Sequence, residues 1–193
     1  ERCFNDASLP LQRYRVATFY ARLQNLYEKF GCNALWDLGD TTDDRVAIPL
    51  PTIREVISGI EHFKSPHNVK IIGNHEQFVR STEIDSGALY ENSFKVIRGV
   101  ETVLVEQVAV VCCSYPASNS ACAEELERAL LTYRHQPTVI LGHVEVVGTK
   151  LKSGTTLEGL PRELFESSSL TLLGHVHLPQ QLGDRPIYYV GSP

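Results

Sequence analysis

Four short apolar segments of this chain each end in a glycine that is followed at once by an acidic, amide or imidazole side chain. The four segment ends are Gly39-Asp40, Gly73-Asn74-His75-Glu76, Gly142-His143 and Gly174-His175-Val176-His177. The residues before these glycines, such as Val69–Ile72, are short, mostly apolar and β-branched runs, which predicts buried strands. Glycine lets the backbone turn sharply at the end of a strand. Since ligands bind at strand ends in α/β folds, the repeated pattern predicts one polar site built from four strand ends.

The rest of the sequence predicts helices that alternate with strands. Helices are expected over Leu11–Phe30, over the segment from a Thr52/Glu55 capping box to Phe63, and over Ser120–Tyr133 with Ser120 as its cap. Strands are expected over Ala34–Leu38, Phe94–Arg98, Glu101–Val105, Val108–Cys113, Thr138–Leu141, Leu170–Leu173 and Ile187–Val190. Glu101–Val105 and Val108–Cys113 are expected to form a hairpin, Gly148–Gly159 a loop and Pro161–Glu166 a short helix. This order predicts an α/β fold of two packed sheets with outer helices.

The composition agrees with one folded domain spanning residues 1–193. The chain is 42% hydrophobic and 21% charged, which is enough apolar material for a core. It has neither an apolar run of about 20 residues nor a signal peptide at its start. We therefore expect a cytoplasmic protein without a membrane span. The adjacent Cys112 and Cys113 lie in an apolar strand, so we interpret them as reduced core thiols.

The charge and the ends of the chain add two further expectations. The net charge of −5 argues against a large electrostatic footprint for nucleic acid, although bound cations would offset carboxylates locally. The chain has no methionine and ends on Gly191-Ser192-Pro193. We therefore expect it to be a fragment of a longer protein.

The polar strand ends offer oxygen and nitrogen ligands without thiolates. Carboxylate, amide and imidazole ligands suit Mn²⁺, Fe²⁺ or Zn²⁺, and a carboxylate such as Asp40 can bridge two ions. Two ions about 3.5–4 Å apart are the usual device for phosphoester hydrolysis. His175 and His177 would share a face if they lay on a strand. His62, His67 and His135 have no such context and are interpreted as surface histidines.

The motifs Gly39-Asp40-x-x-Asp43, Gly73-Asn74-His75-Glu76, Gly142-His143 and Gly174-His175-x-His177, in this order, resemble those of the calcineurin-like metallophosphoesterases. The resemblance covers nearly the whole chain. It implies an α/β/β/α sandwich with two divalent metal ions, most often Mn²⁺. It implies that Asp40 bridges the ions, that Asn74, His143 and His175 complete one site, and that His177 belongs to the other. His75 would be the proton donor or the stabiliser of the transition state, oriented by Asp43.

Within that family, three stretches are similar to the SbcD-type DNA nuclease branch: Leu160–Phe165, Leu173–Gln180 and Ile187–Pro193. This similarity implies a metal-dependent phosphodiesterase that acts on DNA as an exo/endonuclease in DNA repair. It also implies an ATPase partner of the SbcC type, docked through segments beyond Pro193, and is compatible with a homodimer.

One family motif is missing from the chain. The family opens with a strand ending in Asp-x-His, which supplies the rest of the second metal site, and no Asp-x-His occurs here. We expect that strand to precede Glu1. Two alternatives stay open: a phosphatase or cyclic-nucleotide phosphodiesterase on the same fold, and a non-catalytic phosphoesterase-fold subunit of a DNA-processing complex.

Overall fold

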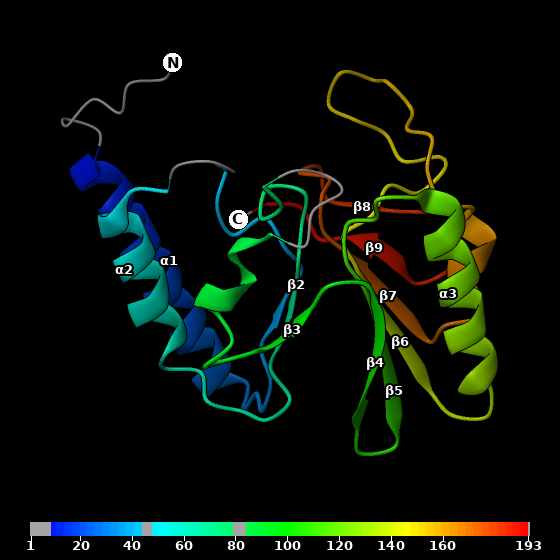
Figure 1. Ribbon diagram of the computed structural model, residues 1–193, viewed down its shortest axis with the longest axis horizontal. Helices are drawn as coiled ribbons and strands as arrows, with labels where there is room; N and C mark the ends of the chain where they lie inside the picture. Colours follow the sequence, from blue (N-terminus) through cyan, green and yellow to red (C-terminus); the bar gives the residue numbers. More distant parts are fainter. Residues whose placement is uncertain (1–8, 44–47, 79–83, 193) are drawn as a thin grey trace.

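The computed structural model describes residues 9–43, 48–78 and 84–192, and these form a layered α/β structure (Figure 1). Two helices, a three-stranded sheet, a six-stranded sheet and one further helix follow one another across the molecule. The predicted two-sheet α/β sandwich with outer helices is confirmed.

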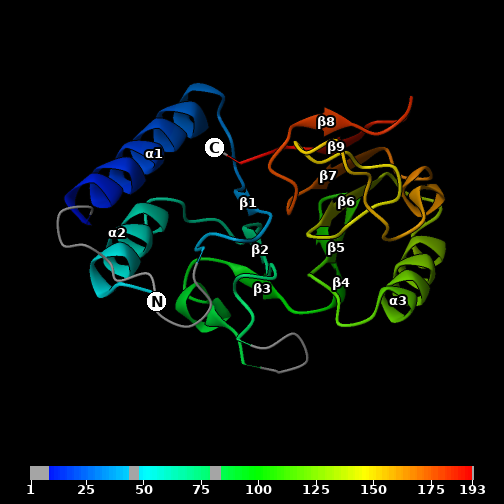
Figure 2. The ribbon, with the colours of Figure 1, turned by 90° about the horizontal axis from the view of Figure 1, so that it is seen from above.

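The three-stranded sheet consists of parallel strands in the order β1-β2-β3. These are β1 (Trp36–Asp37), β2 (Val69–Ile71) and β3 (Lys95–Ile97). Helices α1 (Leu9–Lys29) and α2 (Leu50–Ile60) lie side by side along one side of this sheet (Figure 2). The cluster beneath them is Tyr20, Val56, Ile60, Phe63, Tyr90 and Phe94.

The six-stranded sheet has the order β4-β5-β6-β7-β9-β8. Its strands are β4 (Val100–Val105), β5 (Val108–Cys113), β6 (Thr138–Gly142), β7 (Leu170–Leu173), β8 (Gln180–Gln181) and β9 (Ile187–Tyr189). The predicted β4–β5 hairpin is present, and β5, β6, β7 and β9 run parallel. Helix α3 (Asn119–Thr132) packs on this sheet, and short 3₁₀ helices span Ser86–Leu89 and Arg162–Phe165.

A fully apolar layer joins the two sheets. It consists of the buried residues Val69, Ile71, Ile97, Val110, Cys112 and Leu141. Because successive strand residues face opposite sides, Cys113 belongs instead to the core beneath α3, together with Cys122. Cys112 and Cys113 are both buried and free, so their interpretation as reduced core thiols is confirmed.

Two predicted helix caps are wrong. Helix α2 begins after Pro49 and has no side-chain cap, so the Thr52/Glu55 capping box does not form. Pro51 lies in the first turn of the helix, where its missing N–H costs no intrahelical hydrogen bond. Helix α3 is capped by Ser118, whose hydroxyl accepts a hydrogen bond from the N–H of Ala121, rather than by Ser120.

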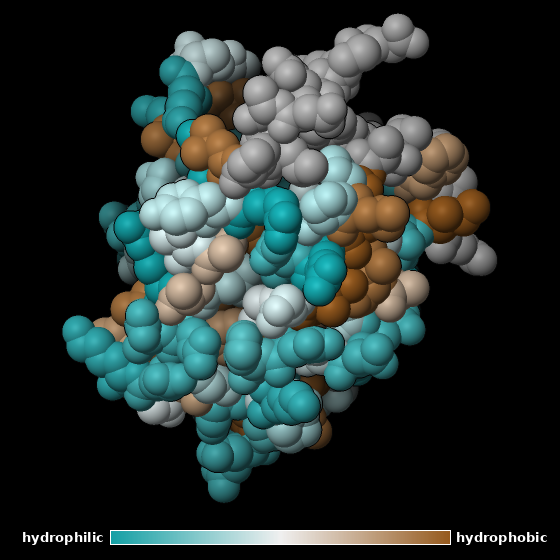
Figure 3. Space-filling model, turned by 90° about the vertical axis from the view of Figure 1, so that its left-hand side faces the viewer, coloured by the Kyte–Doolittle hydropathy of each residue, from teal (hydrophilic) through white to brown (hydrophobic). Residues whose placement is uncertain are grey.

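The outer face of the molecule over α1 and α2 mixes apolar and polar side chains (Figure 3). Its exposed apolar residues include Leu26, Phe30 and Leu50. Scattered apolar side chains are common on folded surfaces. Within the described ranges, no helix combines the length and apolar character that crossing a bilayer requires.

Candidate metal centre

The predicted ligands lie beyond the carboxyl ends of parallel strands. Asp40 and Asn74 follow the neighbouring strands β1 and β2, and His143 and His175 follow the neighbouring strands β6 and β7. The N–H of Tyr115 donates to the carbonyl of Ile72 at 2.9 Å, which connects the two sheets at this edge. Packing of the sheets therefore brings two ligands from each sheet to one place, as expected for α/β folds.

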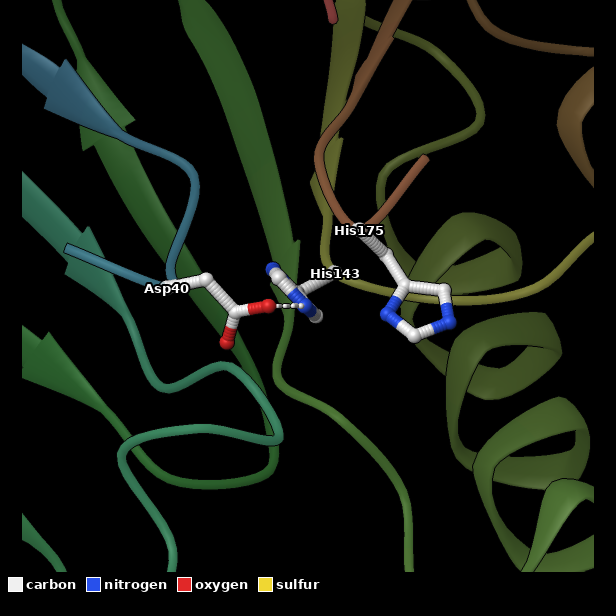
Figure 4. Close-up of side chains that lie close together, drawn as sticks. All are labelled: Asp40, His143 and His175. Carbon is white, nitrogen blue, oxygen red and sulfur yellow. Dashed lines mark ion pairs between the residues drawn. The ribbon is translucent and has the colours of Figure 1, made fainter. Parts of the chain in front are cut away.

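Asp40, His143 and His175 offer ligand atoms that all lie within 4.8 Å of one another (Figure 4). Nε2 of His143 is 3.1 Å from Oδ2 of Asp40 and 3.1 Å from Oδ1 of Asn74. The same Asn74 oxygen lies 2.8 Å from Nδ1 of His175. Asp40, Asn74, His143 and His175, four of the five predicted metal ligands, therefore converge.

The hydrogen bonding of His143 shows that this cluster suits a cation. Nδ1 of the fully buried His143 lies 2.6 Å from the carbonyl oxygen of Leu38, which can only accept a proton. In a neutral ring, Nε2 then carries a lone pair that faces an Asp40 oxygen and an Asn74 oxygen. A cation between these atoms would satisfy all three acceptors at once. The donor set and the carbonyl that fixes the ring both fit a divalent metal.

Glu145 orients His175, and sequence reasoning missed it. Its Oε1 lies 3.1 Å from Nε2 of His175, so Nε2–H can donate to the carboxylate and leave the Nδ1 lone pair facing Asn74. Burial and then the nearby His143 lower the pKa of His175, against the opposing effect of Glu145. A neutral imidazole is the form that binds a metal. The position of Glu145, two residues after His143, is the sequence signal that could have found it.

The carboxylate of Asp40 is held ionised. Burial alone would raise the pKa of Asp40, but the hydrogen bond and charge of His143 together with the N–H of His75 lower it. That N–H donates to Oδ1 of Asp40 at 2.9 Å. An ionised carboxylate is the form that ligates a cation.

The backbone at the centre is strained and closely packed. Asp40 and His175 have φ values of 57° and 75°, in the left-handed region that costs a non-glycine residue about 1–3 kcal/mol. A Cβ on Gly73 would lie 2.2 Å from an Asp40 oxygen, and one on Gly39 would lie 2.5 Å from Nδ1 of His143. These glycines are therefore required because the ligands occupy the space of a side chain.

A buried ion network lies next to the candidate metal centre, and the sequence analysis did not predict it. The carboxylate of Glu76 accepts hydrogen bonds from the N–H groups of Asp40, Thr41 and Gly73 at 2.7, 2.7 and 2.8 Å. It therefore holds the loops after β1 and β2 together. The sequence signal was Lys70, a charged residue within an otherwise apolar strand.

Lys70 supplies the charge that balances Glu76. Its Nζ is fully buried and lies 3.0 Å from Glu76, 3.2 Å from Asp37 and 2.6 Å from the Thr41 hydroxyl. It also lies 4.5 Å from the centre of the Tyr90 ring. Burial would lower the pKa of Lys70, but Asp37 and Glu76 raise it above its usual value.

His75 is held differently from what the sequence predicts. Its Nδ1 lies 2.7 Å from the main-chain carbonyl of Asp43 and 3.7 Å from that residue's carboxylate. The Asp43 side chain is 90% exposed. Because a carbonyl only accepts, Nδ1 carries the proton, and the main chain of Asp43 orients the ring more closely than its carboxylate does.

His177 lies outside the Asp40–His143–His175 cluster. It is exposed and lines a neighbouring pocket together with Glu145 and His175. Strand β7 ends at Leu173, so His175 and His177 do not lie on a strand and the expectation that they share one strand face is wrong. The role of His177 in a second metal site stays a prediction.

Comparisons with known proteins add one distant structural similarity. No protein-family model matches the sequence, and no curated protein matches it. The chain is similar to a Staphylococcus aureus protein described as a candidate 5′-nucleotidase, whose 2.05 Å crystal structure contains alpha-ketoglutarate. The TM-score is 0.44 at 16% identity, over 69% of this chain and 34% of that chain. This chain thus matches about a third of that protein's length. The fold and the site together define a two-sheet α/β protein with a candidate divalent-cation centre.

Proposed function

We propose that this protein is a metal-dependent phosphoesterase. The convergence of Asp40, Asn74, His143 and His175 on one point carries the proposal, because these side chains together supply the oxygen and nitrogen ligands of a divalent cation. Divalent cations bound there would activate water and offset the charge of a phosphate. Mn²⁺ is the ion we expect, and Fe²⁺ or Zn²⁺ would suit the same ligands.

The chain itself would hold the ions and manage protons. Asp40 would bridge two ions, with Asn74, His143 and His175 completing one site and His177 contributing to the other. His75 carries its proton at Nδ1 against the Asp43 carbonyl, so proton exchange with a substrate would occur at Nε2. It would act as general acid or charge stabiliser, with Asp43 positioning it.

At a finer level, we propose a phosphodiesterase that acts on DNA as an exo/endonuclease. The motif order and the three stretches Leu160–Phe165, Leu173–Gln180 and Ile187–Pro193 support this. The ATPase partner, the homodimer and the single domain over residues 1–193 are part of the same proposal.

Metal binding and chelation test the proposal. Calorimetric titration of the full-length protein with Mn²⁺ should show binding that Asp40→Asn weakens at least about 100-fold and Asp184→Asn leaves unchanged. Asp184 is an exposed turn residue, which makes it a matched control. Hydrolysis of a DNA oligonucleotide should stop in excess chelator. Undetectable Mn²⁺ binding, or hydrolysis that persists in chelator, contradicts the proposal.

Substrate choice separates the alternatives. Bis(4-nitrophenyl) phosphate and DNA report phosphodiesterase activity, 4-nitrophenyl phosphate reports phosphatase activity, and cyclic AMP reports cyclic-nucleotide phosphodiesterase activity. Binding of Mn²⁺ without turnover of any of them would indicate the non-catalytic subunit.

A further inference from the structure

A pocket of about 350 Å³ opens directly beside the candidate metal centre. His175 lines both the pocket and the metal cluster. Its apolar lining includes Leu151 and Leu157 from one loop, and Lys152 from the same loop supplies a cation. A molecule in this pocket would therefore contact both His175 of the candidate metal centre and leucine side chains.

The pocket volume decides what size of group fits. Pockets that enclose small molecules measure about 300–1,000 Å³, so this one is at the lower end of that range. The pocket is suited to one small organic group next to the reacting phosphate.

The apolar lining is fixed by hydrogen bonds from β8. The side chain of Gln180 accepts from the N–H of Lys150 at 3.0 Å and donates to the carbonyl of Lys150 at 2.9 Å. Within the loop, Lys150 pairs with Thr156, and the N–H of Leu157 donates to Thr149 at 2.8 Å. In Figure 1 this loop, drawn in yellow and gold, stands over the end of the six-stranded sheet near β8. The lining is therefore preformed, which lowers the ordering cost of binding.

We propose, on the basis of the phosphoesterase function above, that this pocket binds one ring-bearing group, the size of a single nucleoside, that is esterified to the reacting phosphate. Leu151 and Leu157 bind the ring through apolar contact, and Lys152 offsets the negative charge of the ester. Gln180 is a positioning residue that fixes the loop. The group is either the terminal nucleoside of a DNA strand or part of a small free ester.

Binding of thymidine, which has no phosphate, tests the pocket without requiring turnover. Saturation-transfer NMR and calorimetry should show thymidine binding to the wild-type protein. Leu151→Ser and Leu157→Ser should each weaken it about tenfold or more, because each removes apolar contact. Leu131 is an exposed residue of helix α3, so Leu131→Ser is the matched control and should bind thymidine as the wild-type protein does. Mn²⁺ affinity should be the same in all four proteins.

The role of Gln180 is tested by comparing two substrates. Gln180→Ala should raise KM about tenfold for the 4-nitrophenyl ester of thymidine 5′-monophosphate while kcat stays the same. KM for dimethyl phosphate, which has no ring, should not change. An equal change in KM for both esters would show that Gln180 only maintains the fold, and would remove it from the proposal.

The outcomes keep the pocket and the proposed function apart. Absence of thymidine binding, or binding that Leu151→Ser and Leu157→Ser leave unchanged, overturns the pocket proposal even if the protein hydrolyses DNA. Leucine-dependent thymidine binding without Mn²⁺ binding supports the pocket and contradicts the phosphoesterase. Displacement of thymidine by a short single-stranded oligonucleotide indicates the end of a DNA strand as the ligand. Displacement by thymidine 5′-monophosphate alone indicates a small ester.

Discussion

The main-chain carbonyl of Asp43 lies 2.7 Å from Nδ1 of His75, and this contact decides which ring nitrogen can exchange a proton. Nδ1 is occupied by the carbonyl, so only Nε2 can serve a substrate. The main-chain N–H of His75 also donates a hydrogen bond to Asp40, one of the candidate metal ligands. The main chain of His75 thus supports a ligand while its side chain stays available for chemistry.

Replacing His75 should separate chemistry from metal binding. His75→Ala keeps the main-chain N–H that supports Asp40, so Mn²⁺ stoichiometry by calorimetry should be unchanged. Turnover of DNA should fall about 10²–10⁴-fold, the usual contribution of a general acid or base. Asp40→Ala should lose metal and activity together. Near-wild-type turnover of His75→Ala, with only a lower melting temperature, would make His75 a structural turn residue.

Asp43 should matter less than His75. The exposed carboxylate of Asp43 is 3.7 Å from the ring, whereas the main-chain carbonyl that survives substitution is 2.7 Å away. We expect Asp43→Ala to reduce kcat by less than about tenfold. A loss as large as that of His75→Ala would show that the carboxylate itself orients the ring. Asp43→Asn, measured in parallel, reports the effect of charge alone.

At the scale of elements, a buried ion network joins the loops after β1 and β2. Lys70 on β2 pairs with Asp37 on β1 and with Glu76 after β2. Glu76 in turn accepts from the main chain on both loops. Removing one partner of a buried pair costs about 3–5 kcal/mol, because the other charge is left uncompensated.

Lys70→Met should therefore destabilise the protein by about 3–5 kcal/mol, with a defined pH dependence. The folded-state pKa of Lys70 is raised above its ordinary value of 10.5. Its stabilisation is then fully present below about pH 10.5 and is lost as pH rises through the folded-state pKa. Denaturant unfolding should show a constant difference from wild type between pH 7 and 9. Lys95→Met, at an exposed pair with Glu101, should cost less than about 1 kcal/mol.

The cap of α3 gives a smaller and independent effect. Ser118→Ala removes the acceptor for the N–H of Ala121 and should cost about 0.5–1 kcal/mol. Ser120 lies inside the helix, where alanine is favourable, so Ser120→Ala should leave the free energy of unfolding unchanged or raise it slightly. Thermal unfolding of both variants measures the difference. A larger loss for Ser120→Ala would assign the cap to that residue.

Element types followed from periodicity, whereas contacts across the fold did not. The continuous apolar run Val108–Cys113 and the helical spacing of Leu11–Phe30 predicted elements that the structure contains. Four site residues were predictable because glycine and a polar residue mark each strand end. Glu145 and Lys70 each had a weaker signal, but their partners could not be predicted because only the folded chain brings those partners near them. The cap at Ser118 was missed because serine at 118 and 120 fits the same local pattern.

At the scale of the molecule, the candidate metal centre forms only when the two sheets pack together. Asp40 and Asn74 follow strands of the three-stranded sheet, and His143 and His175 follow strands of the six-stranded sheet. The apolar layer between the sheets includes the fully buried Leu141, one residue before Gly142-His143. Cation binding should therefore stabilise the packed sheets as one unit, because a ligand that binds only the folded state shifts the unfolding equilibrium.

Calorimetric melting tests this coupling and the single domain together. Wild-type protein should unfold in one transition, and Mn²⁺ should raise its midpoint, whereas Mn²⁺ should leave the midpoint of Asp40→Asn unchanged. Leu141→Ala should cost about 2–5 kcal/mol through the cavity it leaves. That loss corresponds to roughly 4–20 °C for the whole transition in a chain of this size. Leu104→Ala, on an exposed part of the hairpin, should change the midpoint by less than about 2 °C. Two separate transitions, with Leu141→Ala moving only one, would show that the sheets unfold independently and that the chain is not a single domain.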